Sequence, residues 1–206
     1  MKFDFWKTAS IHVDCQKGFS PLCPNELPVP DGHNIVSALN EQAKLARYRI
    51  CTKDWHPYNS LHIADEMHPQ FTPIEGYPNM DMYWNRHCIA GSEGAELLPG
   101  LPKESEYDFV VYKGLEKDMH PYGACYHDLA EKQSTGLIQY LLGQHKIIDT
   151  VIVGGLATDF CVAKTAIQLA QTSMFKVIVN LPACRAIGDI TKTLDDFKKY
   201  YIETIT

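Results

Sequence analysis

The segment GGLATDFCVAKTA (154–166) places a cysteine where a nucleophile would be useful. It follows the apolar run DTVIV (149–153), which is typical of a short buried strand. Apolar residues then recur at helical spacing, so Cys161 falls in the first turn of a helix just past the carboxyl end of a strand. Ligands bind at that edge of open α/β sheets, and a helix N-terminus favours a thiolate. The alternative, an inert buried thiol, is common for free cysteines and stays open on this segment alone.

Two other reactive groups stand at the ends of predicted strands. Asp14 ends SIHVD, and Lys113 ends VVYK. The carboxyl ends of parallel strands share one edge of the sheet, so these side chains are expected to lie near Cys161. Asp14 would then accept the proton of the thiol, and Lys113 would stabilise the charges that result. Taken singly, an Asp at a strand end is often a turn residue and a Lys there is usually solvated.

A third group of residues has the spacing of a metal site. KDWHPYNSLH supplies Asp54, His56 and His62, and YWNRHC supplies His87. In extended backbone Asp54 and His56 point to the same side. One carboxylate with three imidazoles suits zinc, iron or manganese, of which we expect zinc first. The alternative is chance clustering, because the chain has nine histidines, and His68 competes as a ligand.

Predicted strands and helices alternate along the chain. The predicted strands are 9–14, 108–112, 149–153, 175–180 and a weaker one at 48–52. Helical patterns occur over 31–46 with Asp31 as N-cap, over 128–145, after Thr158 and over 189–201. This alternation predicts an α/β fold with a parallel sheet and helices on both faces.

Residues 54 to about 103 interrupt the alternation. This stretch has no clear periodicity and is rich in Pro, His, Met, Trp and Tyr. Structureless loops longer than ~15 residues are usually functional or disordered. The aromatic content argues against disorder. We therefore expect a single domain over 1–206, in which this stretch is a metal-binding loop insertion.

Composition excludes several classes of function. The formal charge of −6 disfavours nucleic acid or an anionic membrane as the main partner. No apolar run approaches the ~20 residues needed to cross a bilayer. Asp4 stands where a signal peptide would be apolar, and the seven cysteines, an odd number without a CxxC pair, fit reduced thiols. We expect a cytoplasmic protein.

Seven segments carry these residues in order. They are VDCQKGF (13–19), TKDWHPYNSLH (52–62), WNRHCIAGSEGAELLP (84–99), VYKG (111–114), YGACYHD (122–128), GGLATDFCVAKTA (154–166) and PACRAI (182–187). The combination resembles the nicotinamidase branch of the isochorismatase-like cysteine hydrolases. The resemblance implies the isochorismatase-like hydrolase fold, with about six parallel strands and helices on both faces. It implies a triad of Asp14, Lys113 and Cys161, and one divalent ion held by Asp54, His56, His62 and His87.

The resemblance also implies features that residue spacing does not give. One is a cis peptide bond between Leu156 and Ala157, with the backbone amides of Ala157 and Cys161 forming an oxyanion hole. The positions that match substrate-contacting residues of the family are Phe19, Trp84, Leu156 and Tyr122, the first two on either side of a pyridine ring. The implied reaction is the metal-dependent deamidation of nicotinamide to nicotinate and ammonia through a thioester, a step of NAD salvage.

Three positions depart from the family pattern. Asn85 replaces a common proline, Ser92 a threonine and Cys125 an aromatic residue, and these changes bear on the shape of the pocket. Two other functions remain open: a related amidase acting on a carbamoyl or ureido substrate, and a non-catalytic metal-binding protein. The expected partners are the small molecule nicotinamide and, as in many such families, further copies of the chain in a homo-oligomer.

Overall fold

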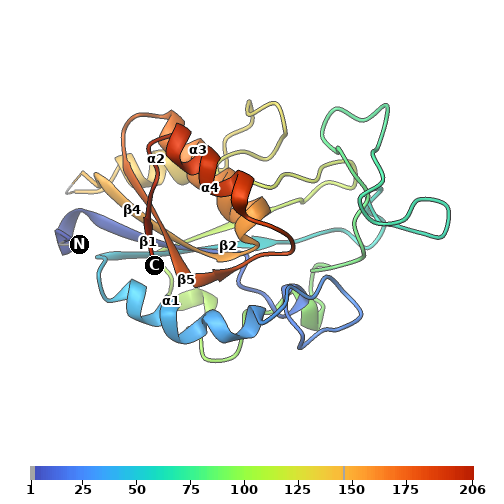
Figure 1. The fold of residues 1–206 in the computed structure, drawn as a ribbon, viewed down its shortest axis with the longest axis horizontal. Coiled ribbons are helices and arrows are strands. Elements are labelled where there is room, and N and C mark those ends of the chain that lie inside the picture. Colours follow the sequence, from blue (N-terminus) through green and yellow to red (C-terminus); the bar gives the residue numbers. More distant parts are fainter. Residues whose placement is uncertain (1–2, 146) are drawn as a thin grey trace.

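A six-stranded sheet, with all its strands parallel, forms the centre of the molecule (Figure 1). The computed structural model describes residues 3–145 and 147–206. The strands are β1 (Thr8–Val13), β2 (Tyr48–Asp54), β3 (Phe109–Lys113), β4 (Thr150–Leu156), β5 (Lys176–Arg185) and β6 (Glu203–Ile205). They lie in the order β3-β2-β1-β4-β5-β6. The parallel sheet that the sequence predicts is therefore confirmed, including all five predicted strands.

The helices cover both faces of the sheet, as predicted (Figure 1). They are α1 (Val36–Ala43), α2 (Leu137–Leu142), α3 (Ala163–Gln171) and α4 (Thr191–Lys199). On one face, α1 packs through Leu39 beside β4 and β5. On the other face, α3 and α4 contribute Leu169 and Phe197 to a larger apolar core with the strands. The sheet is therefore buried on both faces, as is usual for a parallel sheet.

The predicted helix over 128–145 is wrong in its first half. The carboxylate of Asp128 accepts hydrogen bonds from the amides of Lys132 (2.9 Å) and Gln133 (2.7 Å). Gly136 then adopts a left-handed conformation with φ 88°. Local side-chain bonds to the backbone compete with helix formation, so the helix begins only at Leu137.

Asp31 occupies the predicted N-cap position, but its side chain does not cap the helix. Asp31 precedes a 3₁₀ turn (Gly32–Ile35) that leads into α1, so its position is the expected one. Its backbone is left-handed, with φ 54°, and its side chain caps no amide. The carboxylate instead accepts a hydrogen bond from the side chain of Asn34 (3.2 Å).

The long irregular segment after β2 is held by pairing between its own halves. The amide of Ala64 donates to the carbonyl of Trp84 (2.8 Å), and the amide of Phe71 donates to the carbonyl of Tyr83 (2.8 Å). A short bridge also joins His56 to Ile89. These contacts fold the segment back over the carboxyl edge of the sheet. Within 3–145 and 147–206, none of the helices is both long and apolar enough to cross a membrane.

Candidate active site

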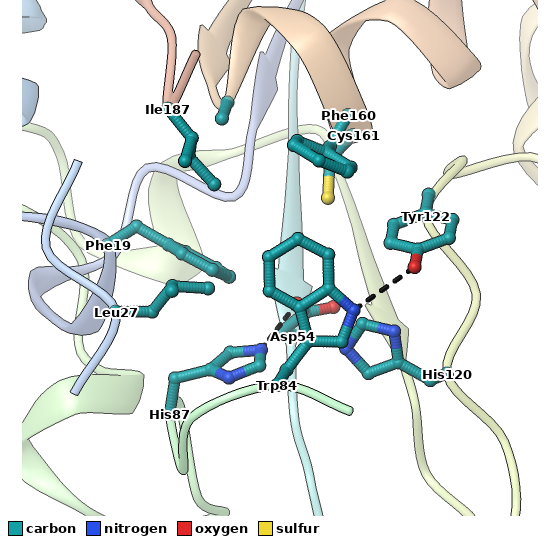
Figure 2. A pocket seen from close by; sticks show the side chains of 11 residues that line it. Phe19, Leu27, Asp54, Trp84, His87, His120, Tyr122, Phe160, Cys161 and Ile187 are labelled. Carbon is teal, nitrogen blue, oxygen red and sulfur yellow. Dashed lines mark hydrogen bonds and ion pairs between the residues drawn. The ribbon is translucent and has the colours of Figure 1, made fainter. Parts of the chain in front are cut away.

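A small pocket lies over the carboxyl edge of the sheet (Figure 2). Its empty volume is about 280 Å³. The sulfur of Cys161 points toward it from one end, and the rings of His87 and His120 lie at the other. The remaining lining residues are Phe19, Leu27, Asp54, Trp84, Tyr122, Ala157, Phe160 and Ile187. A predicted nucleophile and predicted metal ligands therefore face one cavity.

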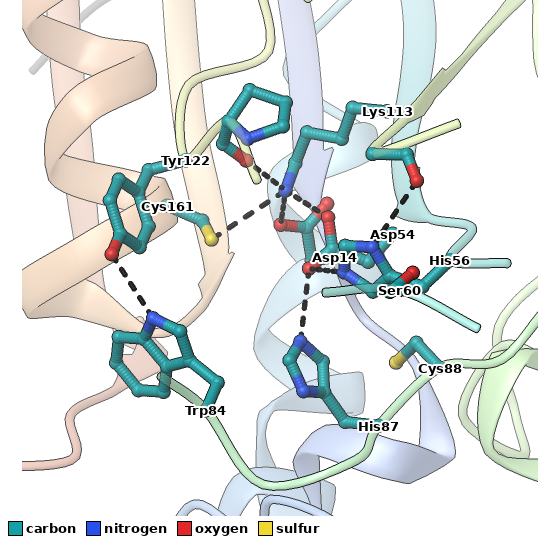
Figure 3. A network of polar contacts seen from close by, with 12 residues as sticks. Asp14, Asp54, His56, Ser60, Trp84, His87, Cys88, Lys113, Tyr122 and Cys161 are labelled. Atoms are coloured by element: carbon teal, nitrogen blue, oxygen red, sulfur yellow. Dashed lines mark hydrogen bonds and ion pairs between the residues drawn. The ribbon is translucent and has the colours of Figure 1, made fainter. Parts of the chain in front are cut away.

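Asp14 and Cys161 come together around the ammonium group of Lys113 (Figure 3). The ammonium nitrogen of Lys113 lies 2.9 Å from the Oδ2 atom of Asp14 and 3.7 Å from the sulfur of Cys161. It also pairs with Asp54 and donates to the carbonyl of Pro121 (3.3 Å). Lys113 and Asp14 are fully buried, and Cys161 is 6% exposed. The ends of three different strands thus supply one dense polar group, as their places in the sequence suggest.

The β2 strand fixes the carboxylate of Asp14. The hydroxyl of Thr52 donates to Oδ1 (2.6 Å), while the backbone amide of Asp14 donates to the carbonyl of Thr52 (3.1 Å). Asp14 itself has a left-handed φ of 47°, which is uncommon outside glycine. Its Oδ2 atom is left to face Lys113. Backbone strain of this kind is often found at functional sites.

Burial and pairing set the charges of this group. Burial disfavours the ammonium form of Lys113, but the carboxylates of Asp14 and Asp54 outweigh it and hold its pKa well above the ordinary value. Burial raises the pKa of Asp14 in spite of Lys113. For Asp54, burial is outweighed by Lys113 and His56, and its pKa is lowered well below the ordinary value. Lys113 is therefore charged, and Asp14 is the carboxylate better able to take a proton.

The pKa of the Cys161 thiol is not lowered, although a helix N-terminus and a nearby cation would each favour the thiolate. Burial raises the pKa of its thiol well above the ordinary value; Lys113 opposes this shift, and Asp14 adds to it. Cys161 lies in a π-helical turn (Thr158–Val162) that leads into α3. Such turns are frequent at functional sites. A raised pKa favours the protonated thiol, so a nucleophilic role calls for a neighbouring base.

The backbone before Cys161 makes a sharp turn. Gly155 has φ 139°, and a Cβ atom there would lie 2.0 Å from the carbonyl oxygen of Val13, so only glycine fits. The Leu156–Ala157 peptide bond is cis, as the family resemblance implies. The carbonyl of Ala157 accepts from the amide of Val162 (3.1 Å). This turn brings Ala157 and Cys161 to the same wall of the pocket.

The predicted metal ligands also converge. Asp54 Oδ2 lies 3.5 Å from His56 Nε2 and 3.6 Å from His87 Nε2. His56 Nδ1 contacts the carbonyl of Gly114 (3.2 Å), and His87 Nδ1 contacts the carbonyl of Asn85 (2.6 Å). A carbonyl can only accept, so both Nδ1 atoms carry the hydrogen and both Nε2 atoms keep a lone pair. This second set of contacts is the usual one for imidazoles that bind a metal.

The donor set fits a divalent ion. His62 joins it with a ring centroid 4.5 Å from that of His56, and its buried Nδ1 has no partner among the described residues. Burial lowers the pKa of His56, and it lowers that of His62 to about 2. Neutral imidazoles beside an ionised Asp54 are the protonation states that metal binding requires.

His120 is a member of this cluster that the sequence reasoning missed. Nitrogen atoms of His56, His62, His87 and His120 all lie within 4.8 Å of one another. His120 comes from the connection after β3, seven residues beyond Lys113, and its only sequence signal is that proximity. The competing candidate His68 contacts Asp65 (3.1 Å) at the surface instead.

Three of the four predicted substrate-contacting residues line the pocket. Phe19, Trp84 and Tyr122 line the pocket, whereas Leu156 is fully buried and does not. The indole nitrogen of Trp84 donates to the hydroxyl of Tyr122 (3.1 Å), which donates to Asp81 (2.6 Å). Leu27, Phe160 and Ile187 also line the pocket, although the sequence reasoning gave them no role.

The three departures from the family pattern leave the polar groups intact. Asn85 meets His87 through its backbone carbonyl, which any residue supplies. Cys125 packs in the apolar core and does not line the pocket. Ser92 immediately precedes a short 3₁₀ turn (Glu93–Ala95).

Comparison with known proteins decides the family. The sequence matches the isochorismatase domain over residues 8–189. The chain belongs to the isochorismatase family. It is 33% identical to a nicotinamidase of Acinetobacter baylyi over 181 residues, 87% of this chain and 81% of the relative.

Solved structures agree with this family assignment. An Acinetobacter baumanii nicotinamidase/pyrazinamidase superposes with a TM-score of 0.87 at 31% identity, over 97% of this chain and 96% of the other. A pyrazinamidase of Pyrococcus horikoshii in complex with zinc superposes with a TM-score of 0.75 at 27% identity, over 97% of this chain and 99% of the other. The predicted fold class is confirmed, and this isochorismatase-family chain is an amidase.

Proposed function

We propose that this protein hydrolyses the carboxamide of nicotinamide, giving nicotinate and ammonia, by way of a thioester on Cys161. The observation that carries the proposal is one pocket that Cys161 lines at one end and the imidazoles of His87 and His120 line at the other. Lys113 contacts both Cys161 and Asp14 behind this wall. The relatives named nicotinamidase support the choice of substrate. So does the lining of the pocket, which is mostly aromatic and apolar and suits a flat ring.

The pocket orients the substrate by its two unlike ends. The ring lies between Phe19 and Trp84, and the carboxamide faces Cys161. Trp84 is held in place by the hydroxyl of Tyr122, so the ring has a fixed wall to pack against. Phe19 is 4% exposed and Trp84 is 2% exposed, so both rings are enclosed by the protein.

Asp14 acts as the base for the first step. As the sulfur of Cys161 attacks the carboxamide carbon, its proton passes to Asp14, whose raised pKa suits a proton acceptor. Lys113 stays charged and stabilises the negative charge that develops on the sulfur and on Asp14. The oxyanion is bound by the amides of Ala157 and Cys161, and each such donor lowers a barrier of this kind by roughly 3 kcal/mol.

The same residues complete the reaction. Asp14 returns its proton to the amide nitrogen, and the C–N bond breaks. Ammonia departs, and the acyl group remains on Cys161 as a thioester. A water molecule then attacks the thioester carbon and gives a proton to Asp14. The C–S bond breaks, and the sulfur takes that proton back. The acid product gives its remaining carboxyl proton to the solvent and leaves as nicotinate, with the enzyme restored.

Asp54, His56, His62 and His87 hold a divalent ion in this proposal. They present two Nε2 lone pairs, an unpartnered Nδ1 atom and a carboxylate to one place. When bound, the ion supplies a positive centre that orients the ring nitrogen of the substrate. The thiol remains the nucleophile of the first step. Zinc is our first expectation, in line with the zinc in the Pyrococcus horikoshii structure.

Mass spectrometry of the covalent intermediate tests this proposal. Acid-quenched wild-type protein mixed with excess nicotinamide should gain the mass of a nicotinoyl group on the peptide that holds Cys161. A matched variant of another buried cysteine, Cys184→Ala, should gain it too, and Cys161→Ala should not. Modification by a carbamoyl or ureido substrate, with none by nicotinamide, would overturn the substrate assignment and keep the cysteine chemistry.

A further inference from the structure

We propose that His120 is a further ligand of the metal centre, so that four imidazoles converge on the ion in this chain, with the carboxylate of Asp54 beside two of them. The inference rests on the proposed metal site and adds to it a residue from a separate loop. The spacing of Asp54, His56 and His62 gives no hint of it, because His120 lies 33 residues beyond His87.

The distances place His120 among the other ligands. Its ring centroid lies 4.2 Å from that of His62, 5.1 Å from that of His56 and 5.7 Å from that of His87. The ligand nitrogens of all four lie within 4.8 Å of one another. Two nitrogens bound to one zinc at ~2.1 Å lie at most ~4.2 Å apart. The four nitrogens are thus close to the spacing that a shared ion requires, and binding would draw them somewhat closer together.

The hydrogen bonding of His120 points to a missing partner. The side chain is 4% exposed, and both ring nitrogens are buried without a hydrogen-bond partner among residues 3–145 and 147–206. Leaving a buried polar group unpaired destabilises the folded protein. By contrast, His56 and His87 each use one nitrogen on a backbone carbonyl. An ion between the four rings would satisfy one nitrogen of His120 directly.

The neighbours of His120 hold its ring toward the cluster. The ring stacks at 12° to that of His56 and at 18° to the indole of Trp84. The backbone amide of His120 donates to the carbonyl of Asn79 (2.8 Å), which ties its loop to the long segment after β2. The next residue, Pro121, accepts from Lys113. The loop is thus bonded both at His120 and at the next residue, and Figure 2 shows the ring of His120 beside that of Trp84.

A fourth imidazole has a consequence for metal selectivity. Imidazoles suit zinc, iron, copper and nickel, whereas carboxylates and water suit manganese and magnesium. Adding His120 to the set raises the nitrogen share of the ligands. We therefore expect the ratio of Zn²⁺ affinity to Mn²⁺ affinity to be higher in the wild type than in a variant without His120.

The test compares His120→Ala with His127→Ala, a histidine of the same connection that lies outside the cluster. Chelator-stripped full-length proteins are titrated with Zn²⁺ and with Mn²⁺ in competition with a chromophoric chelator. Loss of a group that merely supports a ligand costs about 10–100-fold in metal affinity. We expect His120→Ala to bind Zn²⁺ at least tenfold more weakly, to bind Mn²⁺ with less change, and His127→Ala to match wild type.

A second readout needs no catalytic activity. Co²⁺ is loaded in place of Zn²⁺, and its visible absorption spectrum is recorded for each protein. A changed ligand set shifts and weakens the bands in His120→Ala and leaves His127→Ala unchanged. If the alanine variant does not fold, as judged by circular dichroism of the metal-free protein, His120→Asn, with a side chain of similar shape, replaces it in both measurements.

The outcomes separate this inference from the proposed function. Wild-type Zn²⁺ affinity and an unchanged Co²⁺ spectrum in the His120 variant would overturn the assignment. A raised KM for nicotinamide with unchanged metal binding would move His120 to the substrate instead, which also overturns it. Weakened Zn²⁺ binding in a protein whose wild type releases no ammonia from nicotinamide would keep His120 as a ligand and reject the proposed function.

Discussion

Replacing Lys113 with methionine removes the cation from a buried group of carboxylates. Lys113 and Asp14 are fully buried, and Asp54 is 2% exposed. Methionine keeps most of the volume of the lysine side chain, so the change tests charge rather than packing. The variant must either bury two uncompensated carboxylates or protonate them.

The expected loss of stability is large. Removing one partner of a buried ion pair costs about 3–5 kcal/mol. For a chain of this size, each kcal/mol lowers Tm by roughly 2–4 °C, so the variant should melt roughly 6–20 °C below wild type.

The loss should depend on pH in a definite direction. In the wild type, the lowered pKa of Asp54 contributes stability that is present above its unfolded pKa, near ~3.9, and is lost as pH falls through the folded pKa. Without Lys113, burial raises the pKa of both Asp14 and Asp54. The folded variant is therefore destabilised at every pH above the unfolded pKa of these carboxylates, near ~3.9. The difference in unfolding free energy between the two proteins should therefore be largest at pH 7 and shrink toward pH 4.

Urea unfolding followed by circular dichroism measures this difference. It is run at both pH values on chelator-treated proteins, with Lys198→Met as the control. Lys198 pairs with Asp195 at the surface, where an ion pair contributes about 0–1 kcal/mol. A Lys113→Met variant within 1 kcal/mol of the control, or one whose deficit stays constant with pH, would refute the account of the buried charges.

Three further changes test other parts of the site. In Gly114→Ala, the new Cβ atom would lie 2.4 Å from the ring of His56, at a backbone φ of 69° that disfavours alanine. Both the Zn²⁺ affinity measured by calorimetry and the Tm should therefore be lower than in wild type. Wild-type values of both would contradict this. Tyr122→Phe removes the hydroxyl that holds Trp84. It should raise the KM for nicotinamide about fivefold, the equivalent of about 1 kcal/mol for one hydrogen bond, and an unchanged KM would show that Trp84 needs no such support. Zinc at about 100 times its Kd should stabilise the chelated protein by about 2.7 kcal/mol in urea unfolding, and no shift would argue against a metal site.

The sequence is sufficient to predict the parts of the site that follow from the topology of a parallel sheet. Asp14 directly follows β1, Lys113 is the last residue of β3, and Cys161 follows β4 after a short turn. Because parallel strands end at one edge, the convergence of these residues needs no knowledge of individual contacts. The D-x-H spacing of Asp54 and His56 is equally local, since both lie in extended backbone.

The rest depends on contacts that no local pattern contains. His120 reaches the cluster only because its loop folds back and bonds to Asn79. The helix predicted from residue 128 loses its first half to the bonds made by Asp128. The strand β6 (Glu203–Ile205) is three residues long, and it is defined by its pairing with β5 rather than by an apolar run.

The central claim is that a cysteine, assisted by a metal site, removes ammonia from nicotinamide. Ammonia release by the purified protein, measured before and after chelation with Cys161→Ala alongside, tests it most directly. The account predicts release by the wild type, a fall on chelation that Zn²⁺ reverses, and none by Cys161→Ala with its metal still bound. Substantial release by Cys161→Ala, or no release by the metal-loaded wild type, would contradict it.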